Sequence, residues 1–329
     1  MSRAGPQTGA ELTVLEDFDE PTLAGSSWDA LLTGTADVPF LLYDWQREWW
    51  RAFGGDRLLL VLAGRADAPV AIAPLFALEE MLFLVGSGGS DYLDVLGEPD
   101  EATLAAMLDA ARAQLPAFQG IGLYNVLLES RTTRILPGVA DRLQLELYQE
   151  GEMGAPYMDL SKPEAEAHLW RRKVRKEDAR MRRAGALRVR SAGSENLEEW
   201  LEVFFEQHAG VWHSAGVRGL EGEDARAFFG GIVRTGHRAG WLRLTMLEWR
   251  ERPAAIEVTL IRRDRHVSYL ASRDPAIREF SAGKVLQAHV ATAALHEGAR
   301  IFDLGLGEEE YKMREASGVR KVANWFLYP

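Results

Sequence analysis

The candidates for chemistry in this sequence are serine, histidine, tyrosine, lysine and carboxylate side chains, because it contains no cysteine. Without cysteine there is no thiolate nucleophile, no disulfide and no cysteine-ligated metal cluster. A histidine titrates near neutral pH, so His208 could take the proton of an attacking ammonium group; a buried structural histidine is the alternative. Trp212 lies four residues later on a predicted helix and would share a face with His208 at a substrate site. No metal site is predicted, since His208 and His213 are five residues apart without a carboxylate motif.

A second group of candidates follows a glycine-rich strand end at residues 302–307. Open α/β sheets commonly place ligands at such strand ends. Tyr311 could donate a proton to a leaving thiolate, and Lys312 could hold a carboxylate or a phosphate. Arg314 would add a positive charge for substrate, and a surface loop with ordinary charges is the alternative. If Asp303 is buried it needs a cationic partner, for which Lys312 and Arg314 are candidates.

The start of the helix predicted over residues 281–296 is a candidate anion site. The first amides of a helix have no partner within the helix, and the helix dipole favours negative charge there. A glycine in the first turn would let an anion approach closely. The predicted residues of this anion site are Arg278, Ser281, Ala282, Gly283 and Lys284.

The first half of the chain contains one polar cluster within a glycine-flanked apolar segment, formed by Asp91, Tyr92 and Asp94. These side chains could receive an acceptor amine, and a structural role in a turn is the alternative. The tryptophans at 45, 49 and 50 are expected in the core rather than in a sugar platform.

Length and composition favour a two-domain protein that stays in the cytoplasm. The chain has 329 residues, of which 47% are hydrophobic, and no apolar run long enough to span a bilayer. The formal net charge of −11 argues against a protein that coats nucleic acid. Residues 171–190 break this trend, with ten Lys and Arg against two acidic residues. This segment is either a solvated helix face or a wall for a phosphate-bearing ligand.

Hydrophobic periodicity predicts a mixed α/β fold in two similar halves, residues 1–155 and 156–329, with the linker near 151–156. Each half shows helices, an antiparallel hairpin and further strand, a helix and a last strand. The first nine residues are expected to be a loose tail, and residues 161–164 a capped helix start. The expected strands are 11–17, 57–63, 69–78, 81–85, 92–96, 121–128, 143–147, 240–249, 254–262, 266–272, 300–304 and 322–327, and the expected helices are 27–32, 43–53, 101–115, 164–183, 196–212, 224–237 and 281–296.

Four short motifs in one order and spacing resemble the CelD-type acyltransferases, which are relatives of the FemAB transferases within the GNAT superfamily. They are Tyr269-Leu-Ala-Ser-Arg-Asp-Pro275, Ser281-Ala-Gly-Lys284, Phe302-Asp-Leu-Gly-Leu-Gly307 and Glu310-Tyr-Lys-Met-Arg314. The first half adds Trp45 with Trp49-Trp50, Ala71-Ile-Ala-Pro-Leu75 and Asp91-Tyr-Leu-Asp94. The tight Gln/Arg-x-x-Gly-x-Gly/Ala loop of ordinary GNAT enzymes is absent.

This resemblance implies tandem GNAT-like domains that transfer an acyl group to an amine by direct attack, with acyl-CoA as the donor and no metal. It also places Tyr269 at the substrate site. One alternative is a FemAB-like aminoacyl transferase, for which the basic segment would hold tRNA or a nucleotide-linked cell-envelope precursor. Another is a non-enzymatic protein of the same fold that binds a metabolite or a partner. The substrates and the oligomeric state stay open.

Overall fold

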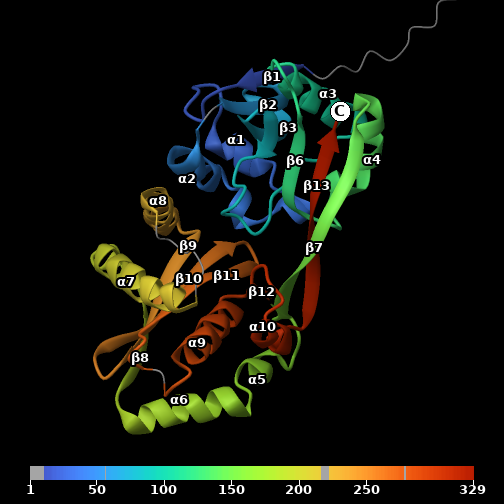
Figure 1. Cartoon of the computed structure of the whole chain (residues 1–329). Helices are drawn as coiled ribbons and strands as arrows, with labels where there is room; N and C mark the ends of the chain where they lie inside the picture. The colour runs from blue at the N-terminus through green and yellow to red at the C-terminus, as the bar shows by residue number, and fades with distance from the viewer. Residues whose placement is uncertain (1–10, 56, 216–221, 278) are drawn as a thin grey trace, which may run out of the picture. The chain divides into compact units, whose positions relative to one another are not determined.

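The computed structural model describes residues 11–55, 57–215, 222–277 and 279–329, without the side chains of residues 35 and 209–215. The expected tail at residues 1–9 lies outside this range. The chain divides into two compact units (Figure 1). The first unit is Met1–Glu152 with Lys321–Pro329, and the second is Met153–Arg320. Both are mixed α/β, as the periodicity predicted.

The first unit is a mixed sheet with helices. Its strand order is β1-β2-β3-β4-β6-β13, antiparallel except for the parallel pair β4 and β6, and β5 pairs with β3. The strands are β1 (Leu12–Leu15), β2 (Arg57–Arg65), β3 (Ala68–Leu78), β4 (Met81–Leu84), β5 (Leu96–Gly97), β6 (Gly120–Leu127) and β13 (Gly318–Tyr328). The helices are α1 (Gly25–Ala30), α2 (Tyr43–Phe53), α3 (Glu101–Arg112) and α4 (Arg131–Leu143), with short 3-10 turns at Gly34–Ala36 and Pro39–Leu41.

The second unit repeats this plan with the strand order β8-β9-β10-β11-β12-β7. Again one pair is parallel, β11 with β12, and the helix α9 connects the two strands. The strands are β7 (Glu146–Asp159), β8 (Leu187–Ser191), β9 (Leu242–Trp249), β10 (Arg252–Arg262), β11 (Arg265–Arg273) and β12 (Ile301–Asp303). The helices are α5 (Ala165–Leu169), α6 (Arg172–Ala184), α7 (Leu197–Ala215), α8 (Glu223–Ala239), α9 (Ala282–His296) and α10 (Glu310–Glu315).

Each unit is completed by a strand from the other half of the chain. After α4, strand β7 runs out of the first unit and pairs with β12, where Met158 lies opposite Phe302. After α10, strand β13 returns to the first unit and pairs with β6, where Leu327 lies opposite Ile121. The strand predicted at residues 322–327 lies within β13 but was assigned to the C-terminal half. The strand predicted at 143–147 overlaps only the start of β7, and the linker predicted near 151–156 lies inside β7. Periodicity along a strand does not say which sheet the strand joins.

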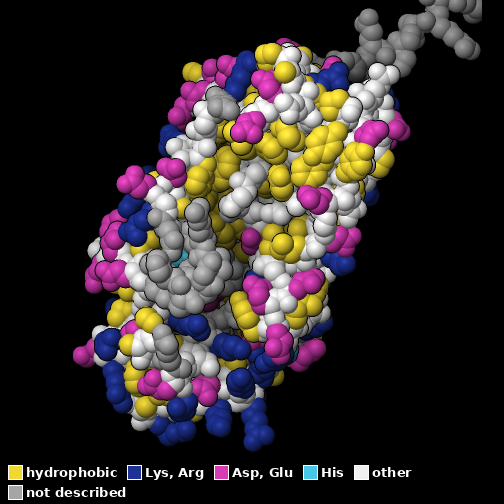
Figure 2. All heavy atoms as spheres, viewed as in Figure 1, with side chains coloured by type: hydrophobic (Ala, Val, Ile, Leu, Met, Phe, Trp, Pro, Cys, Tyr) yellow, Lys and Arg dark blue, Asp and Glu magenta, His cyan; other side chains and the backbone are white. Residues whose placement is uncertain are grey.

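Charge is distributed unevenly between the two units. The first contains 24 Asp and Glu against 10 Lys and Arg, a formal net charge of −14. The second contains 25 acidic residues against 28 Lys and Arg, a net charge of +3. Figure 2 shows Lys and Arg side chains gathered on the surface formed by α6. The acidity of the whole protein is therefore a property of its first unit.

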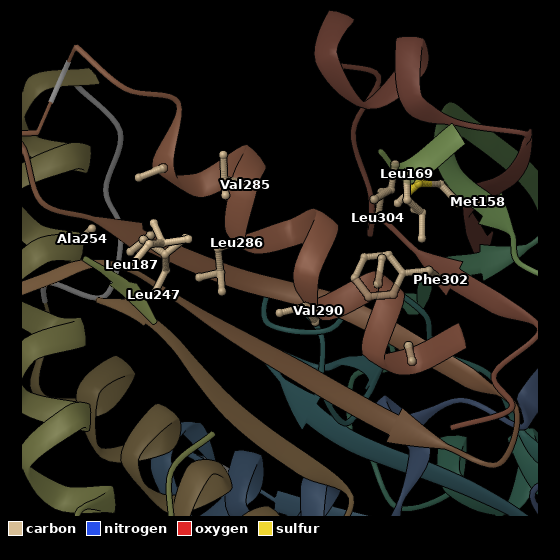
Figure 3. Packing of buried hydrophobic residues seen from close by; sticks show 14 of the residues in the cluster. Met158, Leu169, Leu187, Leu247, Ala254, Val285, Leu286, Val290, Phe302 and Leu304 are labelled. Atoms are coloured by element: carbon tan, nitrogen blue, oxygen red, sulfur yellow. The ribbon is translucent and has the colours of Figure 1, made fainter. Parts of the chain in front are cut away.

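The core that positions α9 in the second unit is shown in Figure 3. One face of α9 contributes Val285, Leu286 and Val290, each no more than 6% exposed. These side chains pack in one cluster with Leu247 of β9 and Phe302 of β12. The cluster holds the start of α9 beside the ends of β10 and β11, where the candidate site lies.

The structure corrects three local predictions. Residues 92–94 are not a strand, and only Leu96–Gly97 pairs with β3. The helix predicted over residues 164–183 is two helices, α5 and α6, and Ser161 does not cap α5, because its hydroxyl donates to Asp159 and α5 begins after Glu164. Helix α4 was missed because it contains Pro137, which usually ends a helix. Within the described ranges, no helix combines the length and apolar character needed to cross a membrane.

Candidate functional site

A cavity of about 550 Å³ opens in the second unit between the sheet and the start of α9. Strands β10 and β11 form one wall, and α9 with the segment before it forms another. Residues just before and within α10 complete the lining. The lining residues are Glu257, Ala271, Ser272, Arg273, Ile277, Phe280, Ser281, Ala282, Gly283, Lys284, Gln287, Glu309 and Tyr311.

Glu257 is the buried acid of this cavity. It lies mid-strand on β10, opposite Ala271 of β11, and is 1% exposed. Burial raises the pKa of its carboxyl to about 7, and a hydrogen bond with Ser268 opposes that shift. Its Oε1 atom has no hydrogen-bond partner among the described residues. A carboxyl group that titrates near neutral pH with an unused oxygen can accept a proton from a bound molecule.

Sequence reasoning missed Glu257, although the sequence carried a signal. It is the single charged residue in the apolar run at residues 254–261. A charge in the middle of a strand that is otherwise buried is costly unless it has a function or a partner. The sequence does not show which cavity this residue lines, because that depends on how α9 packs.

The start of α9 forms part of the cavity wall. Ser281, Ala282, Gly283 and Lys284, the described members of the predicted anion site, all line the cavity. A Cβ atom added to Gly283 would meet nothing within 4 Å in the described structure, so the approach to the first turn is open. Ser281 is the N-cap residue, but in this part of the chain its side chain makes no capping hydrogen bond. Arg278 lies outside the described residues.

Tyr311 and Lys284 meet at the rim of the cavity. The Nζ atom of Lys284 lies 5.8 Å from the centre of the Tyr311 ring and 3.9 Å from a carboxylate oxygen of Glu315. Glu315 also pairs with Arg171. Burial lowers the pKa of Lys284, while burial and nearby carboxylates raise that of Tyr311 to about 12. Tyr311 is therefore protonated at neutral pH and can act as a proton donor. Arg273 adds a second cation to the lining, which the sequence analysis did not single out.

Two other predicted residues near α10 are engaged elsewhere. Lys312 donates to the carbonyl oxygen of Leu306 at 2.5 Å and pairs with Glu309 at 3.2 Å. Arg314 pairs with Glu310 one turn earlier. Neither side chain lines the cavity, so this cavity does not provide the ligand contact that was expected of Lys312. The buried Asp303 accepts a hydrogen bond of 2.8 Å from Arg265, a partner that the sequence analysis did not consider.

The predicted base His208 is buried outside the cavity lining. Its ring stacks on Phe204 with 5.3 Å between ring centres, and it is 3% exposed. Burial lowers its pKa to about 4, so the ring is neutral at working pH and a weak base. Trp212 lies on α7, but its side chain is not among those described. Tyr269 lies on β11 at a β-bulge, where Val258 and Thr259 face Leu270 and Ser268.

The polar cluster of the first unit is built into its interior. The ring of Tyr92 is 1% exposed and packs against Phe40. Burial raises the pKa of the Asp94 carboxyl to about 6, while hydrogen bonds with Thr132, the Val95 amide and Ser130 oppose the shift. Asp91 is half-buried and does not line the cavity described above. In the described ranges, no group of three potential metal ligands was found.

The sequence comparison agrees with the position of the cavity. Residues 170–313 match the family model described as "Acetyltransferase (GNAT) domain". All the lining residues fall inside this range. The second unit contains a GNAT domain. No curated protein matches the chain.

Solved structures resemble most of the chain at low identity. FemX has a TM-score of 0.65 at 12% identity, covering 93% of this chain and 96% of FemX. L-PGS from Bacillus licheniformis has a TM-score of 0.59 at 12% identity, covering 95% and 93% of the two chains. A tandem GNAT protein from the clavulanic acid biosynthesis pathway has a TM-score of 0.51 at 12% identity, covering 97% and 98%. The tandem GNAT-like, mixed α/β fold predicted from the sequence is thus confirmed.

Proposed function

We propose that the second unit transfers an acyl group from acyl-CoA to an amine, with Glu257 as the general base. The main support is the position of Glu257, a buried acid that lines the same cavity as the open start of α9. The GNAT domain supports a transferase, and a pKa near 7 lets this carboxyl accept and release protons at working pH. His208 is a poorer base because burial lowers its pKa to about 4.

The donor would lie along the start of α9. The first-turn amides and the helix dipole favour an anion, and Gly283 leaves room for a pyrophosphate. Arg273 of β11 and Lys284 of α9 add positive charge to the lining of the same cavity. No metal is required by this arrangement, since backbone amides and two cations can neutralise the phosphates.

The transfer needs two proton movements. Glu257 takes a proton from the ammonium group, and the resulting amine nitrogen attacks the thioester carbonyl. A C–N bond forms, the C–S bond breaks, and Tyr311 donates a proton to the leaving thiolate. Because Tyr311 is 41% exposed, water can return that proton, while the proton on Glu257 leaves with product release. No covalent enzyme intermediate is formed, which agrees with the absence of cysteine.

The experiment compares Glu257→Gln with wild type, using acetyl-CoA titration and acyl transfer to a panel of amines. We expect Glu257→Gln to bind acetyl-CoA about as well as wild type but to lose roughly 100-fold or more in kcat. Because the base must be ionised, wild-type kcat/KM should rise with pH and level off above about pH 7. The matched control is Glu309→Gln, which removes a half-exposed carboxyl from the same cavity.

A variant Glu257→Gln with wild-type turnover would reject this base. Failure of acetyl-CoA to bind wild type would reject the donor, whatever the role of Glu257. The CelD or FemAB type, the cytoplasmic location and an acceptor role for Asp91, Tyr92 and Asp94 stay predictions.

Helix α6 favours a second candidate, an aminoacyl transferase that takes its donor from tRNA. Arg172, Lys173, Lys176 and Arg183 are exposed, and no acidic residue of the described chain pairs with them. Four such cations on one helix suit a polyanion better than one pyrophosphate. A nucleotide-linked cell-envelope precursor would present fewer phosphates to the same surface.

Salt dependence separates the two donors. If α6 holds tRNA, raising the salt from about 50 to 200 mM should weaken binding more than about tenfold. The double variant Lys173→Glu, Lys176→Glu should weaken it further, whereas Arg65→Glu in the first unit should not. If neither the added salt nor the double variant changes tRNA binding, α6 is an ordinary solvated surface.

A further inference from the structure

A row of aromatic side chains crosses one face of the sheet in the first unit. It runs from α2 across β3, β4, β6 and β13 to the part of β7 that belongs to this unit. Successive ring centres lie between 5.6 and 6.1 Å apart. Its members, in spatial order, are Trp50, Phe76, Phe83, Tyr124, Phe326, Tyr328 and Tyr148. We call this set the aromatic row.

The exposure of the aromatic row increases toward β7. Phe76 is 9% exposed beside α2, whereas Tyr328 is 36% and Tyr148 is 49% exposed. Phe83, Tyr124 and Phe326 are half-buried. Figure 2 shows hydrophobic side chains gathered in one continuous area over β6 and β13. The row is therefore mostly a surface, and of its members only Phe76 of β3 is buried.

Rings of the row lie over two glycines of β6. A Cβ on Gly122 would be 2.7 Å from Cε1 of Phe83 and 3.3 Å from Cε1 of Phe326. A Cβ on Gly120 would be 2.8 Å from Cδ1 of Tyr328. The rings of Phe326 and Tyr328 are parallel within 2°, whereas Tyr124 meets Phe326 at 86°. The absence of side chains at both glycines therefore gives the rings their room.

Carboxylates flank the exposed end of the aromatic row. Glu146, Tyr148 and Glu150 alternate along β7 and so share one face. Glu146 accepts the hydroxyl proton of Tyr148, and Glu150 lies close enough to raise the pKa of Tyr124, after the larger effect of burial. Glu150 is exposed and pairs with no cation in the described part of the chain. The surface thus combines aromatic rings with negative charge.

We propose that the aromatic row binds a linear oligosaccharide that carries amino groups. The C–H faces of a pyranose are slightly positive and pack on the negative face of an aromatic ring. The regular spacing of the rings suits several consecutive sugar units. An ammonium substituent is attracted both by Glu150 and by the π faces. The proposal concerns binding alone and does not depend on the proposed transfer reaction.

Charge disfavours the other occupants of such a surface. A single-stranded nucleic acid also stacks on aromatic rings, but its phosphates would meet a unit with a net charge of −14. A second copy of this chain would bring its own Glu146 and Glu150 close to the same residues across a two-fold contact. Like charges then oppose that contact.

Calorimetric titration with a β-1,4-linked glucosamine hexamer tests the proposal. We expect wild type to bind it, and Tyr328→Ala and Tyr148→Ala to weaken binding about fivefold each. Tyr328→Phe keeps the ring and should bind like wild type. Glu150→Gln should weaken binding of this hexamer but not of a β-1,4-linked glucose hexamer. The matched control is Val70→Ala, which removes an exposed apolar side chain of the same sheet outside the row.

Several outcomes would overturn the proposal. Absence of hexamer binding, or equal binding by wild type and both Tyr→Ala variants, rejects the aromatic row as a saccharide site. Equal affinity for the glucose hexamer rejects the amino group as a determinant. Tighter binding of a dT oligonucleotide indicates nucleic acid instead. Sedimentation that shows a wild-type dimer and a monomeric Tyr328→Ala variant indicates self-association. Thermal melting of each variant checks that it is folded.

Discussion

At the residue scale, two buried carboxyl groups differ in whether their oxygens have hydrogen-bond partners. Asp94 accepts from the hydroxyl groups of Ser130 and Thr132 and from the amide of Val95, so its environment is closed. Glu257 has one oxygen without a partner in the described structure, and the residue lines a cavity. Burial raises the pKa of both groups, to about 6 and about 7. This difference is why we propose a catalytic role for Glu257 and a structural one for Asp94.

We expect Asp94→Asn to change the dependence of stability on pH. Because the pKa of Asp94 is raised in the folded state, the wild type binds the proton more tightly than the unfolded chain does. Its free energy of unfolding should fall as pH rises from about 4 to 6, and Asp94→Asn lacks this fall. Across that range, the free energy of unfolding of the variant should rise by about 3 kcal/mol relative to that of wild type. Urea unfolding at a series of pH values measures it.

Asp100→Asn is the control for this prediction, since it has the opposite sign. Asp100 caps α3 by accepting from the amide of Thr103, which holds the pKa of its carboxyl below the ordinary value. Its contribution to stability is therefore lost as pH falls below about 4. If Asp94→Asn followed wild type at every pH, the carboxyl of Asp94 would not be desolvated.

At the scale of elements, the start of α9 and strand β6 use glycine for different purposes. Gly283 leaves open space at a helix start, whereas Gly120 and Gly122 are covered by rings from neighbouring strands. The first arrangement leaves a ligand access to backbone amides, and the second makes room for aromatic rings over the strand. Sequence alone does not distinguish the two, because the difference lies in what the neighbouring elements place above the glycine.

We expect Gly283→Val to abolish acetyl-CoA binding while α9 remains folded. The branched side chain would occupy the space in front of the first turn, but valine is tolerated in a helix at roughly half a kcal/mol relative to alanine. Calorimetric titration measures the affinity, and thermal melting checks the fold. Gly55→Val is the control, since a Cβ there also meets nothing within 4 Å but lies in the other unit. Unchanged affinity in Gly283→Val would place the donor away from α9.

At the scale of the whole molecule, the two units are tied through the chain by exchanged strands. Strand β13 comes last in the sequence yet belongs to the first unit, and β7 leaves the first unit to complete the second. The chain can therefore not be cut at residue 155 into two complete domains. Loss of the last strand should damage the unit to which residues 1–152 belong.

We expect Leu327→Ala to loosen the first unit selectively. Leu327 is fully buried opposite Ile121, and truncating a buried leucine costs about 3 kcal/mol. Hydrogen exchange followed by mass spectrometry should show faster exchange in β6, with β12 unchanged. Lys321→Ala is the control on the same strand, because its ion pair with Glu152 is exposed and contributes little. Faster exchange confined to β12 would contradict the strand exchange.

The sequence by itself determined the elements and the class of fold. Periodicity identified the hairpin of β2 and β3 and the helix at residues 281–296, because such patterns depend on side chains within a few residues of each other. The absence of cysteine excluded thiolate chemistry. Only the tertiary structure decided which sheets β7 and β13 join, since an apolar strand can pair with any open edge. Only packing shows that Glu257 faces a cavity, that His208 is buried against Phe204, and that rings from five strands form one row. Contacts between residues far apart in sequence create each of these features, so no local pattern predicts them.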